Sequence, residues 1–93
     1  MIIGILHLSI SIPEANSLKD KRSVIRSMKD RTVAHMNVSA AEVGKQDLWK
    51  AGEFAFVTVA ASKMIVEQRL AKLSTRLRAD PRYVVLTIET EFL

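Results

Sequence analysis

The chain has 93 residues, of which 48% are hydrophobic, and its formal net charge is +4. This length fits one domain over residues 1–93 with a small core, and the hydrophobic fraction excludes a disordered chain. The absence of cysteine excludes disulfides, thiolate metal sites and cysteine nucleophiles. The mildly basic balance is compatible with an RNA, DNA or acidic protein partner.

Residues 2–12 predict a first strand, which Pro13 ends. Isoleucines and leucines at every second position give this strand one firmly apolar face. These residues are Leu6, Leu8, Ile10 and Ile12. The segment has no basic leader and no small-residue cleavage site, so we expect a strand and not a signal peptide. No apolar run approaches the ~18 residues of a transmembrane helix, and we expect no membrane association.

A helix is predicted over roughly 18–35. Ser17 is a suitable N-cap, and Asp20 follows it in a capping-box arrangement. The apolar side of the helix contains Leu18, Ile25 and Met28. Basic residues at spacings of 3, 4 and 3 align on another side and form what we call the first basic stripe. Its members are Lys19, Arg22, Arg26 and Lys29.

Residues 38–43 predict a weaker strand, and residues 44–47 a turn. The connection up to Gly52 carries Trp49. This side chain either closes one end of the core or presents an aromatic ring on a mobile loop. Leu48 beside it favours closure, because two adjacent apolar side chains suggest an anchored connection.

The second half repeats the strand–helix–strand pattern, with strands at 53–61 and 83–92 and a helix at roughly 63–79. Ser62 can cap this helix and Asp80-Pro81 ends it. Its apolar stripe recurs at helical spacing and consists of Val66, Leu70, Leu73 and Leu77. A second basic stripe, spaced 3 and 4, consists of Arg69, Lys72 and Arg76.

The order βαββαβ predicts an α+β fold, a ferredoxin-like sandwich. In this fold a four-stranded antiparallel sheet carries both helices on one face, with the first and third strands central. The other face then has no helix, and we expect an exposed apolar cluster there. Such a cluster indicates a partner or a homodimer. Its predicted members are Ile3, Ile5, Phe54, Phe56 and Val85.

The segments SLKDKRSV (17–24), NVSAAEVG (37–44) and QDLW (46–49) resemble the YlxP-like family, small bacterial proteins classed as a domain of unknown function. The resemblance covers essentially the whole chain. It implies the ferredoxin-like fold, a bacterial cytoplasmic protein and no established enzyme activity. Members are often encoded near translation-initiation and ribosome-maturation genes, which associates the family with RNA or the ribosome.

The two basic stripes admit two interpretations. Each can be the solvated side of an amphipathic helix, or the two together can be a phosphate-contacting surface, since both helices pack on the same sheet face. Our leading hypothesis is a non-enzymatic protein that binds RNA or a ribosomal particle. The residues expected to contact phosphates are Lys19, Lys21, Arg22, Arg26, Lys29, Arg69, Lys72 and Arg76. The alternative is a protein-interaction or self-association module that uses the helix-free sheet face.

The remaining motifs give no clear indication of a function. Residues 54–57 match the middle of the RNA-recognition motif pattern, but its start and end are absent, which favours a packing or dimer role for the two phenylalanines. Neither His7 nor His35 has partners at metal-ligand spacing. Ser9 and Ser11 lack a nucleophile-elbow motif, and no phosphate-loop pattern occurs. We therefore expect no catalytic residues, no metal, no cofactor and no enzyme activity.

Overall fold

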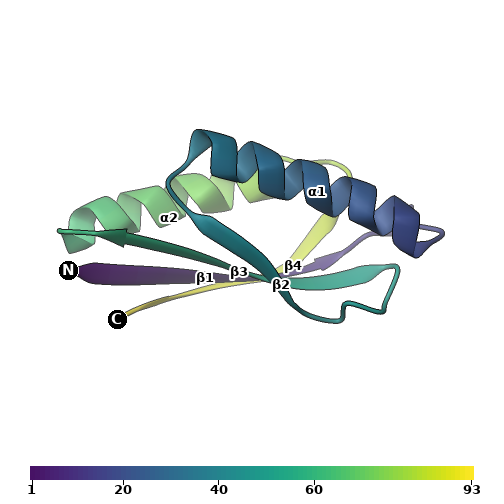
Figure 1. Cartoon of the computed structure of the whole chain (residues 1–93), viewed down its shortest axis with the longest axis horizontal. Coiled ribbons are helices and arrows are strands. Elements are labelled where there is room, and N and C mark those ends of the chain that lie inside the picture. The colour runs from purple at the N-terminus through teal and green to yellow at the C-terminus, as the bar shows by residue number, and fades with distance from the viewer.

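The computed structural model describes residues 1–93 and consists of two layers (Figure 1). One layer is a sheet of four strands: β1 (Ile2–Ser11), β2 (Ser39–Gly44), β3 (Ala51–Ala60) and β4 (Val84–Phe92). The other layer contains two helices, α1 (Leu18–His35) and α2 (Lys63–Arg78). Both helices cover the same face of the sheet, and the opposite face carries no helix (Figure 1).

The strands lie in the order β2-β3-β1-β4. Every neighbouring pair is antiparallel, and β1 pairs with both β3 and β4. The predicted α+β, ferredoxin-like βαββαβ arrangement with β1 and β3 at the centre is thus confirmed. The predicted bounds of the elements are close to those observed, and the largest difference is that β3 begins at Ala51 instead of residue 53.

Both predicted helix starts are confirmed by their caps. The Ser17 hydroxyl accepts a hydrogen bond from the Asp20 N–H at 3.1 Å, and the Asp20 carboxylate accepts one from the Asn16 N–H at 3.0 Å. The Ser62 hydroxyl accepts from the Ile65 N–H at 3.2 Å. These bonds satisfy amide groups that have no partner inside the helix, which fixes where each helix begins.

The core lies between the helices and the sheet. On the strand side, β1 supplies three of the four alternating residues predicted from the sequence, and the fourth, Ile12, directly follows the strand; all four are buried. On the helix side, α2 supplies its whole predicted apolar stripe, also buried. Gly4 of β1 allows α2 to approach closely, because a Cβ atom at this position would collide with Val66 and touch Leu70.

The predicted position of Phe54 and Phe56 on the helix-free face is wrong. Directly opposite residues of an antiparallel pair share a face, and Leu6 lies opposite Phe56 and Leu8 opposite Phe54. Both rings are therefore inside the core, with at most 1% of their surface exposed. The physical reason is volume: the space between sheet and helices takes the larger side chains of β3, and the smaller Ala55 and Val57 fall on the open side.

The prediction for Val85 is also wrong, because β4 contains a bulge. Ser9 pairs with Thr87 but Ile10 pairs with Val85, so Leu86 is an extra residue that interrupts the alternation. Val85 consequently turns toward the helices and packs against the core. Its neighbour Val84 lies opposite Ser11 on the helix-free face.

Candidate nucleic-acid interface

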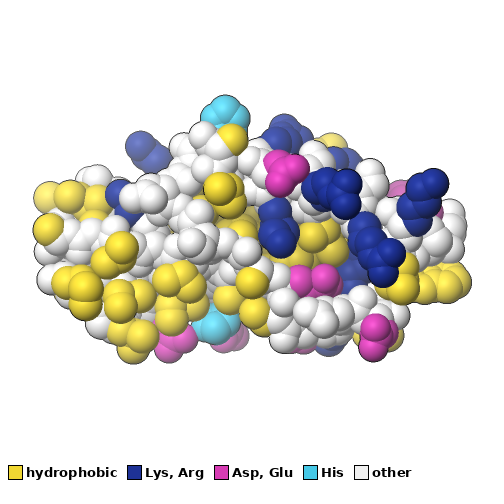
Figure 2. All heavy atoms as spheres, in the orientation of Figure 1, with side chains coloured by type: hydrophobic (Ala, Val, Ile, Leu, Met, Phe, Trp, Pro, Cys, Tyr) yellow, Lys and Arg dark blue, Asp and Glu magenta, His cyan; other side chains and the backbone are white.

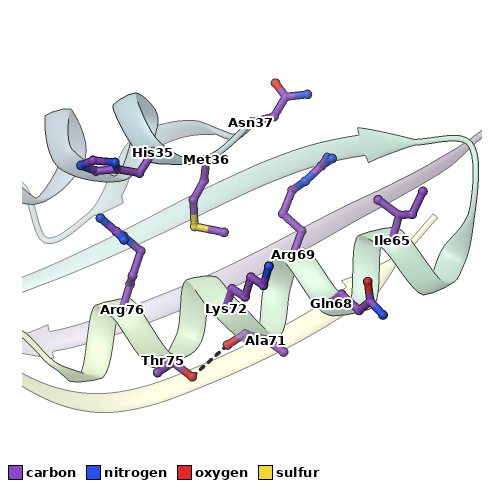
Figure 3. Close-up of a pocket in the computed structure, with 10 residues that line it drawn as sticks. All are labelled: His35, Met36, Asn37, Ile65, Gln68, Arg69, Ala71, Lys72, Thr75 and Arg76. Atoms are coloured by element: carbon purple, nitrogen blue, oxygen red, sulfur yellow. Dashed lines mark hydrogen bonds between the residues drawn. The ribbon is translucent and has the colours of Figure 1, made fainter.

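The gap between the two helices forms a basic groove. Its volume is about 750 Å³, and it is lined by the C-terminal end of α1, the residues just after it, and one side of α2. All three members of the second basic stripe line it, namely Arg69, Lys72 and Arg76. Their side chains rise from α2 toward His35, Met36 and Asn37 on the opposite wall (Figure 3). No aspartate or glutamate is among the lining residues of this groove.

Arg69 is held in place by a chain of hydrogen bonds. Its Nη1 donates to the Thr58 hydroxyl at 2.6 Å and to the Val59 carbonyl at 3.2 Å. The Thr58 hydroxyl in turn donates to the Asn37 carbonyl at 2.7 Å. The guanidinium is therefore positioned by the sheet and by the residue that follows the α1 cap, and its remaining N–H groups are available to a ligand.

A smaller cavity continues along the same space toward the C-terminal end of α2. Arg76 lines both cavities, and Arg31 of α1 lines the second one together with Asp80. The Asp80 carboxylate accepts hydrogen bonds from the Arg82 guanidinium at 2.9 and 2.5 Å, and this bonding lowers its pKa below the usual value. Arg82 therefore offsets the charge of Asp80, and the interhelical space stays cationic.

Two basic residues of this space were not predicted as site residues, Arg31 and His35. They belong to neither stripe. Arg22 lies nine residues before Arg31, and Arg26 lies nine residues before His35. Nine residues at 3.6 per turn correspond to half a rotation beyond two turns, so these pairs project from opposite sides of α1. A helical-wheel comparison of the two helices against their common sheet face could have found them.

The first basic stripe does not share a cavity with the second. Lys19, Arg22 and Arg26 line a shallow depression of about 550 Å³ bounded only by α1 residues, including Asp30. Figure 2 shows Lys and Arg side chains gathered over the half of the molecule that contains the first turns of α1. The structure thus presents two separate basic regions on the helical side, and Lys29, which lines neither cavity, is half-buried.

Lys21 is not available for phosphate contacts, so its prediction as a site residue is wrong. Its side chain is only 1% exposed, and its Nζ lies 3.0 Å from the Glu42 Oε2. The same ammonium donates to the Lys45 carbonyl at 2.8 Å and approaches the Gln46 carbonyl at 3.4 Å. Lys21 belongs to the core side of α1 with Ile25 and Met28, and it connects the helix to the end of β2.

Trp49 does not close the core as predicted. Trp49 and its neighbour Leu48 are 51% and 52% exposed, on the connection between β2 and β3. Both ends of this connection are bonded to other elements. Lys21 holds the carbonyls at its start, and the Lys50 carbonyl accepts from the Ile12 N–H at 2.9 Å. The alternative prediction, an aromatic ring on a mobile loop, agrees with the exposure of the ring, but the connection that carries it is bonded at both ends.

The helix-free sheet face combines an apolar cluster with charges. Of the five predicted residues, Ile3 and Ile5 lie there, opposite Val59 and Val57. We call these four residues the sheet patch. Beside it, His7 Nε2 and Glu91 Oε1 lie 2.9 Å apart. Figure 2 shows hydrophobic side chains gathered over the end of the molecule where β1 begins.

No helix is both long and apolar enough to cross a membrane, and no group of three or more His, Asp or Glu side chains is placed to hold a metal ion.

Comparisons with known proteins agree with the resemblance noted in the sequence. A family model described as "Protein of unknown function (DUF503)" matches residues 3–90. The chain is also 30% identical over 91 residues to "Uncharacterized protein YlxP" of Bacillus subtilis (strain 168), an alignment that covers 98% of this chain and 99% of that protein. The chain therefore belongs to the DUF503 family, which includes YlxP-like proteins and has no assigned function.

Proposed function

We propose that this protein is a cytoplasmic, non-enzymatic RNA-binding protein that contacts RNA or a ribosomal particle through its helical side. The observation that carries the proposal is the interhelical groove, where Arg69, Lys72 and Arg76 converge and no carboxylate lines the surface. Cationic side chains gathered without acids attract phosphates, and binding releases the counterions of the nucleic acid.

The arrangement of Arg69 supports the same proposal. Ordering a long side chain on binding costs entropy, but the bonds of Arg69 to Thr58 and Val59 already fix its guanidinium in the free protein. Preorganisation of this kind favours binding, because less freedom is lost when the ligand arrives.

The distribution of acidic side chains supports binding of RNA to the helical side. Glu53 and Glu91 lie in register with Ser9 and Ile5 of β1, on the helix-free face, and Glu89 lies there opposite His7. A polyanion is therefore repelled from the sheet side and attracted to the helical side. We place the phosphate contacts on the two basic regions of the helices.

The test is RNA binding measured at several salt concentrations, with total bacterial RNA and with ribosomal subunits. The variant is K72Q/R76Q, which removes two groove cations. The matched control is K63Q/R78Q, which removes the same charge from the same helix; both residues lie outside the groove, and Arg78 faces the β4 side. Each lost phosphate contact reduces the slope of log affinity against log salt by ~0.7 for single strands.

We expect weaker binding and a shallower slope for K72Q/R76Q, with the control close to the unchanged protein. No binding to either preparation at low salt would refute the proposal, and equal binding by all three proteins would refute the role of the interhelical groove in it. Urea unfolding of each variant shows whether a loss of binding reflects a loss of folded protein.

A second candidate function is self-association through the sheet patch. It is favoured by the exposure of Val57 and Val59, 39% and 49%, beside Ile3 and Ile5, because adjacent exposed apolar side chains indicate an interface. We commit to a second copy of the chain as the occupant. The patch lies at one end of the sheet, so a two-fold axis through it brings patch against patch. Glu89 and Glu53 then lie outside the centre, and Glu91, which borders the patch opposite Ile5, has His7 Nε2 within 2.9 Å of its carboxylate.

Sedimentation equilibrium over a range of concentrations tests this candidate. We expect V57D to shift the chain toward monomer, and A34D, which adds the same charge on exposed α1 surface, to leave association unchanged. A protein that is monomeric at all concentrations, or a V57D variant that associates normally, would eliminate it.

A further inference from the structure

We infer that the connection between β2 and β3 presents Trp49 as a stacking surface for an unpaired base, so that the RNA of the proposed function is bound as a single strand at the first basic stripe. This inference rests on the proposed RNA binding and adds to it the class of RNA and a residue that contacts a base.

Trp49 differs from every other aromatic residue of the chain. Phe54, Phe56 and Tyr83 are buried in the core. Phe92 is the next most exposed, and the Lys63 ammonium lies over its ring at 5.3 Å from the centroid. Trp49 alone exposes half of its surface on a connection between elements, and a large aromatic side chain left in water at a fixed position is a common recognition element.

The connection is fixed from the inside by a buried lysine. Lys21 brings an ammonium group into the protein interior, which is costly unless the charge is well bonded. Two of its three polar contacts are backbone carbonyls at the start of this connection, those of Lys45 and Gln46. Lys45 is also the one residue other than glycine with a positive φ, 56°, a conformation that is sparsely populated outside glycine.

The other end is fixed to the segment that precedes α1. The Lys50 ammonium donates to the Pro13 carbonyl at 3.0 Å, and the Lys50 carbonyl accepts from Ile12. The connection is thus bonded on one side to the first turn of α1 and on the other to the residues leading into it. In Figure 1 it lies below the N-terminal half of α1, at the same end of the molecule.

This position places an exposed aromatic at the end of the helix where the first basic stripe begins. Lys19, Arg22 and Arg26 line an open depression there. Basic side chains that follow a sugar–phosphate backbone, combined with an aromatic ring on which a base stacks, are the recurring elements of single-strand recognition. Paired bases in an A-form helix are stacked on each other and present no free face to a side chain.

The chain contains a single tryptophan, so its fluorescence reports on Trp49 alone. We propose titration with a ten-nucleotide oligouridylate and with an RNA duplex of the same length. Stacking predicts strong quenching by the single strand and little by the duplex. The variant W49L is expected to bind the single strand on the order of tenfold more weakly, in line with the usual contribution of one stacked base. W49F is expected to retain most of the affinity, and L48Q serves as the control for loss of an exposed apolar neighbour.

Three outcomes are distinguishable when binding is also followed by filter retention. Selective loss of single-strand binding in W49L, with W49F close to the unchanged protein, supports the inference. Equal single-strand binding by W49L and the unchanged protein, while K72Q/R76Q is impaired, overturns the inference but leaves RNA binding in place. No RNA binding by the unchanged protein overturns both the inference and the proposed function. Circular dichroism and urea unfolding confirm that W49L is folded.

Discussion

The two faces of the sheet are built from alternate residues of the same strands, yet they have different roles. Toward the helices, β3 presents Phe54 and Phe56, both fully buried; toward the open side it presents Val57 and Val59, both partly in water. Both sets are apolar. Hydropathy therefore establishes that β3 has two apolar faces, but side-chain volume and register with β1 determine which face the helices cover.

Charge separates the two sides more sharply than hydropathy does. The helical side carries the cationic groove and the first basic stripe, and the open sheet side carries the sheet patch with Glu89 and Glu91 in register beside it. An RNA and a second copy of the chain would therefore occupy opposite sides, and the two candidate functions are compatible with each other. Substitutions on one side should leave the other unaffected.

Substitutions at Phe56 and Val57 should show the largest difference between the two faces of the sheet in the free energy of unfolding. F56A removes a fully buried ring and should lower the free energy of unfolding by about 3–5 kcal/mol, since the lost transfer energy adds to the energy of the cavity. V57A removes two methyl groups from a half-exposed site and should lower it by no more than about 1 kcal/mol. Urea unfolding of both variants measures the difference. Similar losses in the two variants would contradict the assignment of faces.

Most of the fold could be predicted because its signals are local and periodic. The helix caps at Ser17 and Ser62, the apolar stripe of α2 and the alternation in β1 each depend on near neighbours in sequence. The wrong predictions concern side-chain orientations that depend on residues distant in the sequence. The orientation of Phe54 and Phe56 depends on register with β1, and that of Val85 depends on the bulge at Leu86, which no alternation pattern reveals.

The candidate site was predicted less completely for a similar reason. The second basic stripe follows from spacing along α2, but the basic residues across the interhelical space from it, Arg31 and His35, come from the other helix. Lys21 was grouped with surface cations because lysine is rarely buried, and its role appears only once Glu42 and the Lys45 carbonyl are placed beside it. Such partners are distant in sequence, so spacing along one helix cannot identify them.

On α1, Lys21 is buried and Lys19 is exposed, so the pair compares a buried and an exposed lysine of the same helix. K21M leaves the Glu42 carboxylate and the Lys45 and Gln46 carbonyls without their cation, and we expect a loss of about 1–3 kcal/mol in the free energy of unfolding. K19M removes an exposed charge and should change it by less than about 0.5 kcal/mol. Thermal or urea unfolding measures both. A neutral K21M would mean that the connection needs no anchor, and it would weaken the argument for a fixed Trp49.

Tyr83 provides a pH-dependent test of burial on the helix-covered side of the sheet. Burial raises the pKa of its phenol to about 12, above the usual value near 10, and its hydroxyl donates to the Leu77 carbonyl at 2.7 Å. The unfolded chain releases this proton near pH 10 and the folded chain near pH 12. The contribution to stability is therefore complete below about pH 10 and is lost as pH rises toward 12.

Comparison with Y83F isolates that effect from the titration of lysines. At pH 8 the variant should be less stable by about 1 kcal/mol, because the Leu77 carbonyl loses its donor. Between pH 10 and 12 the stability difference between the two proteins should shrink or reverse. Parallel stability curves over this range would show that the phenol is not shielded in the folded state.

His7 gives the smallest expected effect and the most specific test of the open side. Its contact with Glu91 is short, 2.9 Å, but both side chains are about half exposed, and polar contacts exposed to water contribute little because water competes for both groups and ordering the side chains costs entropy. H7Q should therefore change the free energy of unfolding by less than about 0.5 kcal/mol, whereas L6A, one residue away and fully buried, should cost several times more. If H7Q proved as destabilising as L6A, the open side of the sheet would have to be covered in solution. The second copy proposed for the sheet patch is then the first candidate for the cover. Repeating the measurement at a lower protein concentration tests it, because a dimer is less stable when the chain is dilute.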